Sequence, residues 1–152
     1  MPRILHEWGL ARMGGWMEAF RGAVYPWHCD HLGHMTVMHY VGLFDQAGWH
    51  VLSALGCGWE AMKARGETFV DARHNIEYKA EQKVGSLIVI DSAAVRVGDK
   101  SLTLKHRMRN VETGVLAATS EIVCVYFDMG QRMAKAIPDD LKERIKAKLA
   151  NV

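Results

Sequence analysis

The sequence predicts an α+β domain in which an antiparallel sheet of about five strands wraps around one long central helix. The first observation is a long apolar stretch with helical character at 36–55. The second is a run of segments with strand-like alternation after Gly58. The third is an amphipathic segment that opens at Pro138 near the end of the chain. A long antiparallel sheet can curl over one apolar helix and bury it.

The N-terminal part of the chain carries the weakest pattern. Residues 1–17 show no clean period and are interpreted as an N-terminal extension of the domain. The stretch 17–27 favours an extended strand, because Pro26 suits the end of a strand better than its centre. A loop over 28–34 then leads to the long helix.

The helix over 36–55 has plausible signals at both ends. Thr36 is a candidate N-cap, and Gly56 is a candidate C′ residue that ends the helix. Apolar residues lie nearly all round its surface, which predicts a fully buried helix. Gly42 and Gly48 lower its helix propensity, and we interpret them as positions of close packing against another backbone.

The later segments alternate with period two, as strands with one buried face do. The strand candidates are 68–78 with an irregularity near Arg73–His74, 86–97, 101–110 and 115–127, with turns at 98–100 and 112–114. The last helix is expected to have Pro138 at its first position and an apolar stripe of Leu141, Ile145 and Leu149. Because one wide sheet face stays open in such an arrangement, a homodimer or a dimer of dimers is expected.

Composition narrows the function classes. The 152 residues suit a single domain over 1–152, and 19 Lys and Arg against 17 Asp and Glu do not favour a nucleic-acid or membrane partner. No apolar run approaches the ~20 residues of a spanning helix. Three cysteines without a CxxC pair argue against a disulfide framework, so a cytoplasmic location is expected.

One segment carries a resemblance to a known family. The run Val24-Tyr25-Pro26-Trp27-His28-Cys29-Asp30-His31-Leu32-Gly33-His34-Met35 contains an Asp followed three residues later by Gly-His. Together with Tyr40, Asp45, the segments 76–78 and 101–104, and Pro138, it resembles the hotdog-fold acyl-CoA thioesterases of the 4-hydroxybenzoyl-CoA thioesterase-like branch, over about residues 18–148. Thr36 and Val37 stand where many relatives place Asn. The resemblance implies thioester hydrolysis without a metal or cofactor.

Asp30 is the residue that this resemblance marks as catalytic. A carboxylate beside a thioester can attack the carbonyl carbon or can deprotonate water, and the sequence leaves both roles open. We expect unpaired N–H groups from Gly33 to Thr36, at the positive end of the helix, to polarise the carbonyl. The alternative is that Asp30 only caps the turn.

Further residues are candidates for the site, and some of them have a structural role as the alternative. His34 either positions the carbonyl or Asp30 or is a hydrogen-bonded loop histidine, and Asp45 is either a second carboxylate or a structural one. Candidate substrate-binding or oxyanion-binding residues are Tyr25, Trp27, Gly33, Met35, Thr36 and Tyr40. Trp27 and Trp49 are either packing residues or walls of an acyl pocket, including an aromatic cage for a quaternary ammonium group, which makes betainyl-CoA a substrate to test.

Three more features have a simple and a functional interpretation. Positive or polar residues near the 98–100 turn, Arg96, Lys100 and Ser101, are candidates for binding CoA, and otherwise belong to a solvated sheet surface. The spacing His28-x-x-His31-x-x-His34 is not typical of zinc ligands, so no metal is expected. Cys29 is expected to be a packed residue and not a nucleophile.

The sequence therefore favours an acyl-CoA thioesterase. Its expected partners are an acyl-CoA and a second copy of itself, and no cofactor is expected beyond the CoA thioester. The alternatives are a non-catalytic acyl-CoA or acyl-carrier binding module, and a hotdog dehydratase or hydratase.

Overall fold

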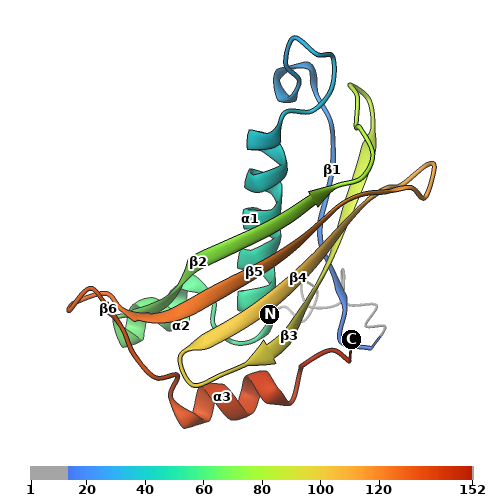
Figure 1. Ribbon diagram of the computed structural model, residues 1–152. Helices are drawn as coiled ribbons and strands as arrows, with labels where there is room; N and C mark the ends of the chain where they lie inside the picture. Colours follow the sequence, from blue (N-terminus) through green and yellow to red (C-terminus); the bar gives the residue numbers. More distant parts are fainter. Residues whose placement is uncertain (1–13, 152) are drawn as a thin grey trace, which may run out of the picture.

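The computed structural model describes residues 14–151 (Figure 1). Its sheet is antiparallel, with strand order β1-β3-β4-β5-β2 and with the short β6 paired to β5. The strands are β1 (Met17–Ala23), β2 (Glu67–Tyr78), β3 (Leu87–Val97), β4 (Ser101–Asn110), β5 (Leu116–Asp128) and β6 (Met133–Ala134). The helices are α1 (Val37–Ala54), α2 (Trp59–Arg65) and α3 (Asp139–Lys146), with a 3₁₀ turn at Pro26–His28.

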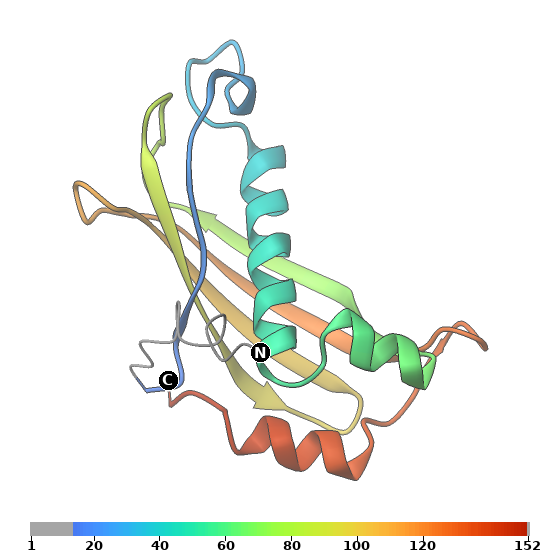
Figure 2. The ribbon, with the colours of Figure 1, turned by 180° about the vertical axis from the view of Figure 1, so that it is seen from behind.

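The sheet curls around α1, which confirms the predicted fold class. Figures 1 and 2, seen from opposite sides, show α1 lying across one face of the sheet, with the blue loop before it at one end and α3 at the other. Helix α1 packs against β1, β3 and β4. The loop that contains Asp30 therefore sits at the N-terminal end of the central helix.

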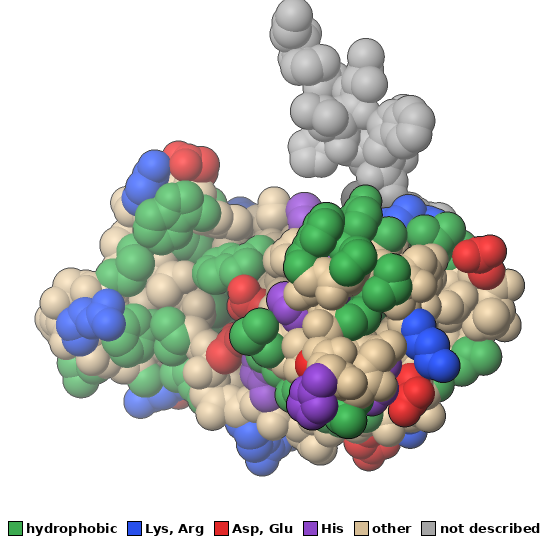
Figure 3. Space-filling view, turned by 90° about the horizontal axis from the view of Figure 1, so that it is seen from above, with side chains coloured by type: hydrophobic (Ala, Val, Ile, Leu, Met, Phe, Trp, Pro, Cys, Tyr) green, Lys and Arg blue, Asp and Glu red, His purple; other side chains and the backbone are tan. Residues whose placement is uncertain are grey.

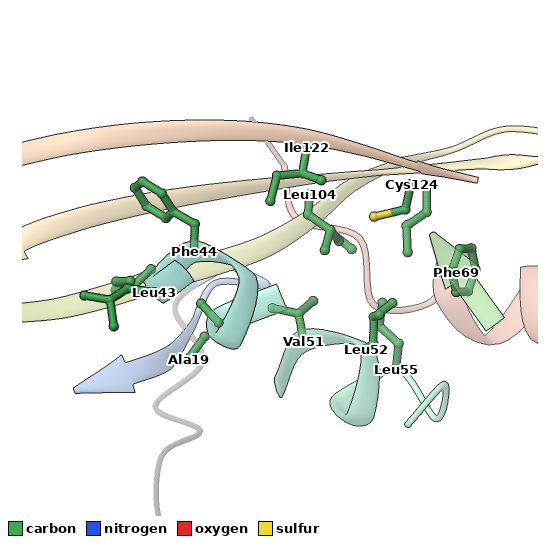
Figure 4. Close-up of a cluster of buried hydrophobic side chains, with 14 of the residues drawn as sticks. Ala19, Leu43, Phe44, Val51, Leu52, Leu55, Phe69, Leu104, Ile122 and Cys124 are labelled. Atoms are coloured by element: carbon green, nitrogen blue, oxygen red, sulfur yellow. The ribbon is translucent and has the colours of Figure 1, made fainter. Parts of the chain in front are cut away.

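Strand alternation builds the core between the sheet and α1. Leu102, Leu104 and Met108 of β4 are buried and face α1, as their period predicts. Phe44 and Val51 of α1 meet them from the other side, and Figure 4 shows side chains of helix and sheet pointing toward one another. This continuous apolar layer fixes α1 against the sheet.

Two expectations about α1 are wrong. The helix is not buried all round, because Met38, Val41 and Trp49 are exposed. Nor do its glycines meet another backbone: a Cβ on Gly42 would contact nothing within 4 Å, and one on Gly48 only Leu104 at 4.0 Å. The sheet covers one side of the helix and leaves the other side open.

The remaining differences from the expected elements are local. Helix α2 was not expected, although Gly58 precedes it and Gly66 ends it with a φ of +68°. Pro138 is the N-cap of α3 and not its first residue. The irregularity in β2 is confirmed, since the register with β5 shifts between Asp71 and Arg73. Over residues 14–151, no helix is both long and apolar enough to cross a membrane.

Candidate active site

The loop before α1 is held by its own backbone. A backbone bridge pairs Cys29 with Met35, so the five residues between them form a closed loop. The N–H of Met35 donates to the carbonyl of Gln82 at 2.7 Å, and the N–H of Thr36 donates to the carbonyl of His28 at 2.9 Å. These bonds fix the loop to the end of the sheet and to the start of the helix.

Asp30 lies inside this loop with its carboxylate held in place. Its Oδ1 accepts a hydrogen bond from the N–H of Leu32 at 2.8 Å, and its backbone carbonyl accepts one from Gly33, whose φ is +84°. The bond from Leu32 is the main reason that the pKa of Asp30 is lowered, with further contributions from the Thr36 hydroxyl and from His31 and His34. The carboxylate is therefore ionised at neutral pH, and it also closes the turn.

The amides before the helix differ from the expectation. We expected free N–H groups from Gly33 to Thr36, but Gly33, Met35 and Thr36 each donate to a backbone carbonyl. The first helical bonds are those of His39 and Tyr40, which both donate to the carbonyl of Thr36. The N–H groups of Val37 and Met38, at the start of α1, have no partner within the helix, and the N–H of His34 in the loop donates to no described residue.

A cleft of about 250 Å³ opens beside the loop, and its lining includes His34, Met35 and Tyr40 together with Tyr78 and Glu81. The ring of Tyr40 meets that of Tyr78 edge-on at 5.2 Å, and burial raises the pKa of Tyr40. The Nε2 of His34 lies 3.6 Å from Oε1 of Glu81, so the His34 side chain lies along the wall of the cleft beside Glu81. Asp30 neighbours this cleft and is not among its lining residues.

The aromatic residues of the loop form their own group. Tyr25 and Trp27 stack with ring centroids 4.6 Å apart, and His28 and His39 meet edge-on at 4.9 Å. Figure 3 looks down on this end of the molecule and shows hydrophobic and histidine side chains side by side over it. Trp27 is not brought to Trp49, which lies more than three turns along α1, so the structure does not form the aromatic pair considered from the sequence.

Trp49 instead shares a pocket with Trp59. This pocket of about 350 Å³ lies between the C-terminal half of α1, α2 and the first half of β2. It is also lined by Asp71 and by Asp45, which the sequence offered as either a second carboxylate or a structural one. Within one chain Asp30 lies in the loop before α1, whereas Asp45 lies at the middle of that helix. Sequence reasoning did not name Trp59 or Asp71 as site residues. Trp59 was missed because helix α2, on which it lies, was not expected.

The candidates for binding CoA lie on the opposite face of the sheet. Arg96 and Ser101 line a depression of about 430 Å³ together with Arg73 and Lys105. Their side chains point away from α1, because the alternating residues Leu102 and Leu104 face it. Lys100 lies in the exposed turn between β3 and β4. The structure brings Arg96 and Ser101 together but does not place them beside the Asp30 loop of the same chain.

His28 forms a structural hydrogen bond, and Cys57 and Cys124 are buried. His28 Nδ1 accepts the N–H of Tyr25 at 2.9 Å. Among the described residues, no group of three His, Cys, Asp or Glu side chains could hold a metal ion. Burial raises the pKa of the Cys57 thiol to about 11 and that of Cys124 further still, so both are poor nucleophiles at neutral pH.

Fold and loop together define the class of protein: a sheet-wrapped helix of the hotdog type with an ionised carboxylate at the N-terminus of that helix. The chain belongs to the thioesterase-like superfamily, whose family model matches residues 24–145. Members of this superfamily hydrolyse acyl-CoA thioesters. The resemblance deduced from the Asp-x-x-Gly-His segment is therefore confirmed.

Particular proteins resemble this chain in sequence or in fold. The chain is 27% identical over 140 residues to an L-carnitine dehydrogenase/betainyl-CoA thioesterase of Agrobacterium fabrum, covering 92% of this chain but only 26% of that protein. Its fold resembles the probable thioesterase YbaW of Escherichia coli, with a TM-score of 0.74 and 23% identity over 87% of this chain and 98% of the other. It also resembles a Staphylococcus aureus protein solved with CoA, with a TM-score of 0.78 and 18% identity over 88% and 85% of the two chains.

Proposed function

We propose that this chain hydrolyses an acyl-CoA thioester to a free acid and CoA, with Asp30 as nucleophile or general base. The observation that supports this most is an ionised carboxylate fixed at the N-terminus of the central helix, where the amides of Val37 and Met38 have no partner within the helix. The helix end adds about half a positive charge there.

Two routes use the same groups. In the first, the Asp30 carboxylate attacks the thioester carbon, the C–S bond breaks, CoA leaves as a thiolate, and water hydrolyses the resulting anhydride. In the second, Asp30 takes a proton from water, the hydroxide adds to the carbonyl carbon, and collapse of the intermediate expels the thiolate. In both, the developing oxyanion faces the amides of Val37 and Met38, which act as donors.

We further propose that the working form is a homodimer joined at β2. This strand ends the sheet, and in the part of the chain that the structure describes its outer edge has no partner strand. The edge runs over twelve residues and carries exposed Val70 and Tyr78, and exposed apolar residues of α1 lie beside it. A long unpaired edge is a template for pairing with another strand.

Pairing of two such edges would complete the site. Antiparallel pairing about a twofold axis through the middle of β2 sets the Tyr78 end of one strand beside the Thr68 end of the other. The cleft with His34 and Tyr40 then faces the pocket that holds Trp49 and Trp59 of the partner subunit. A thioester bound beside Asp30 would direct its acyl group toward that second pocket.

The finer features of the substrate also remain proposals. The betainyl-CoA named for the Agrobacterium relative is one candidate acyl-CoA. Arg96, Lys100 and Ser101 are candidates for binding the CoA phosphates, and Arg73 and Lys105, which line the same depression, are further candidates.

The cysteines Cys29, Cys57 and Cys124 are free thiols, which supports a cytoplasmic location.

A panel of acyl-CoA thioesters with a thiol-detecting reagent tests the proposed function. Hydrolysis is expected to release one thiol for each carboxylic acid formed. Tight CoA binding without thiol release from any acyl group would favour the non-catalytic binding module. Addition of water to an enoyl-CoA without thiol release would favour a hydratase instead.

A further inference from the structure

A buried glutamine joins the Asp30 loop to the sheet. Gln82 lies in the segment 79–86 between β2 and β3 and is only 3% exposed, although it is polar. Its backbone carbonyl accepts the N–H of Met35 at 2.7 Å, and its backbone also forms a hydrogen bond with the side chain of Tyr40. Met35 closes the loop that contains Asp30, and Tyr40 lines the cleft beside that loop. The backbone of Gln82 therefore holds two parts of the candidate site.

The side chain of Gln82 fixes the position of that backbone. Its Oε1 accepts from Nδ2 of Asn110 at 3.0 Å, and its Nε2 donates to the carbonyl of Glu81 at 2.8 Å. Because a buried amide without partners is costly, these two bonds constrain both ends of the amide. The adjacent Glu81 carries the carboxylate that lies near His34 in the cleft wall. A change at the Gln82 amide is therefore transmitted to the cleft through the backbone on both sides of it.

Asn110 is the other end of this connection. It is the last residue of β4, and its Oδ1 accepts the N–H groups of Glu112 and Thr113, each at 3.0 Å. The oxygen of this amide is thus committed to the turn between β4 and β5, so its nitrogen is the atom that faces Gln82. Gln82 must then present its oxygen to Asn110 and its nitrogen to Glu81. The network therefore defines the orientation of both amides.

We propose that Gln82 and Asn110 form a positioning pair that sets the place of the Asp30 carboxylate relative to the start of α1. The inference rests on the proposed thioesterase function and adds two residues that act through the loop, since neither of them lines the cleft. A shift of Gln82 carries the Met35 amide with it, and Met35 is paired with Cys29 at the base of the loop. A small displacement of a reacting group lowers a rate strongly, even when its origin is remote from the chemistry.

Two variants break the pair from opposite sides. Asn110→Asp keeps an oxygen for the turn amides but presents a second oxygen to the Gln82 amide, and a flip of that amide would only bring its oxygen against the carbonyl of Glu81. Gln82→Met removes the amide from a side chain of similar length. Each variant is expected to lower kcat for thiol release about tenfold, with KM changed less than threefold. The double variant is expected to be no slower than the slower single variant, because both changes remove one connection. Wild-type kcat in both single variants, or losses that multiply in the double variant, overturns the proposal.

Matched controls separate positioning from a general loss of stability. Gly114→Ala strains the same turn, because Gly114 has a φ of +74°, while its added Cβ meets nothing within 4 Å. Gln131→Glu adds one negative charge at an exposed amide, as Asn110→Asp adds one at the turn. Both controls should keep the wild-type kcat, even where Gly114→Ala lowers the midpoint of thermal unfolding. A tenfold loss of kcat in either control would show that turn stability or charge, and not the amide pair, sets the rate.

Amide hydrogen exchange gives a readout that does not depend on activity. The Met35 amide should exchange faster in Asn110→Asp and in Gln82→Met than in the wild type. The Lys135 amide, which donates to the carbonyl of Tyr126 at 3.0 Å near the other end of β5, should keep its wild-type rate. If no thioester releases thiol in the wild type, the proposed hydrolysis is wrong, and faster exchange at Met35 alone still supports the connection to the loop. An unchanged Met35 rate in both variants overturns the positioning role, whether or not hydrolysis is found.

Discussion

Asp30 Oδ1 accepts the backbone N–H of Leu32 at 2.8 Å, so the carboxylate proposed to act on the thioester also closes the loop that presents it. The alternatives drawn from the sequence, a capping residue or a catalytic one, are thus not exclusive in this structure. A substitution that keeps an acceptor at this atom can remove the negative charge and keep the turn. This property allows the two roles of Asp30 to be separated by experiment.

Asp30→Asn is the variant that does so. The amide oxygen can still accept from Leu32, while the nucleophile or base is lost, so kcat for thiol release is expected to fall by about 10²–10⁴-fold. Circular dichroism and the midpoint of thermal unfolding should stay close to those of the wild type. Asp99→Asn is the control with an unchanged rate. A variant that keeps more than a tenth of the wild-type rate would remove Asp30 from the mechanism.

The lowered pKa of Asp30 gives the rate a defined pH dependence. A depressed carboxyl pKa means that the active, ionised form persists below the usual aspartate range, so the Asp30-dependent fall in kcat/KM is expected only at a pH below that range. Thr36→Val removes the hydroxyl that helps to lower this pKa, and should therefore move the acid limb to higher pH. Thr119→Val, on the other face of the sheet, is the control. A Thr36→Val profile that is lower at every pH but not displaced would assign the hydroxyl a structural role only.

Local sequence patterns predicted the elements of this fold well, because each depends on its own residues. The alternation from Ser101 to Asn110 and the stop at Gly56, with a φ of +80°, are examples. Helix α2 was missed because its seven residues are too few for an apolar period to be visible, although Gly58 and Gly66 mark both of its ends.

The candidate site was less predictable because it depends on tertiary contacts. The Met35 amide is occupied by the carbonyl of Gln82, a residue more than forty positions later in the chain, and no local signal indicates this. Trp49 and Trp59 share a pocket only because the chain turns between two helices. The Asp-x-x-Gly-His segment was informative because it is local, whereas the acyl pocket is assembled from separate elements.

Buried His106 should make stability depend on pH. Its Nδ1 lies 2.6 Å from Oγ of Ser92, and burial lowers its pKa to about 4. The folded state therefore binds fewer protons than the unfolded state, so this contribution to stability is complete above about pH 6.5 and is lost as the pH falls toward 4. The free energy of unfolding in urea is expected to drop by about 2 kcal/mol between pH 7 and pH 5 through this group.

His106→Gln tests that assignment, because glutamine can still bond to Ser92 and does not titrate. The variant should lose most of the pH dependence between pH 7 and pH 5, even where its stability at pH 7 is lower. His50→Gln, at an exposed position of α1, is the control that should keep the wild-type dependence. The same slope in His106→Gln and in the wild type would show that other groups are responsible.

The β2 edge should control both assembly and activity. Val70 is 37% exposed on this edge, and a lysine there adds the charge that natural proteins use to prevent edge pairing. Val70→Lys is therefore expected to convert a dimer into monomers in sedimentation velocity at micromolar concentration. Because the proposed site needs both subunits, kcat/KM should fall at least tenfold, and the loss should be partly reversed at higher protein concentration.

Val115→Lys is the matched control, since this valine is 46% exposed in the turn between β4 and β5. A fully active monomer would show that one chain holds the complete site, and the proposed place of the Trp49 and Trp59 pocket beside the partner's Asp30 would then be wrong.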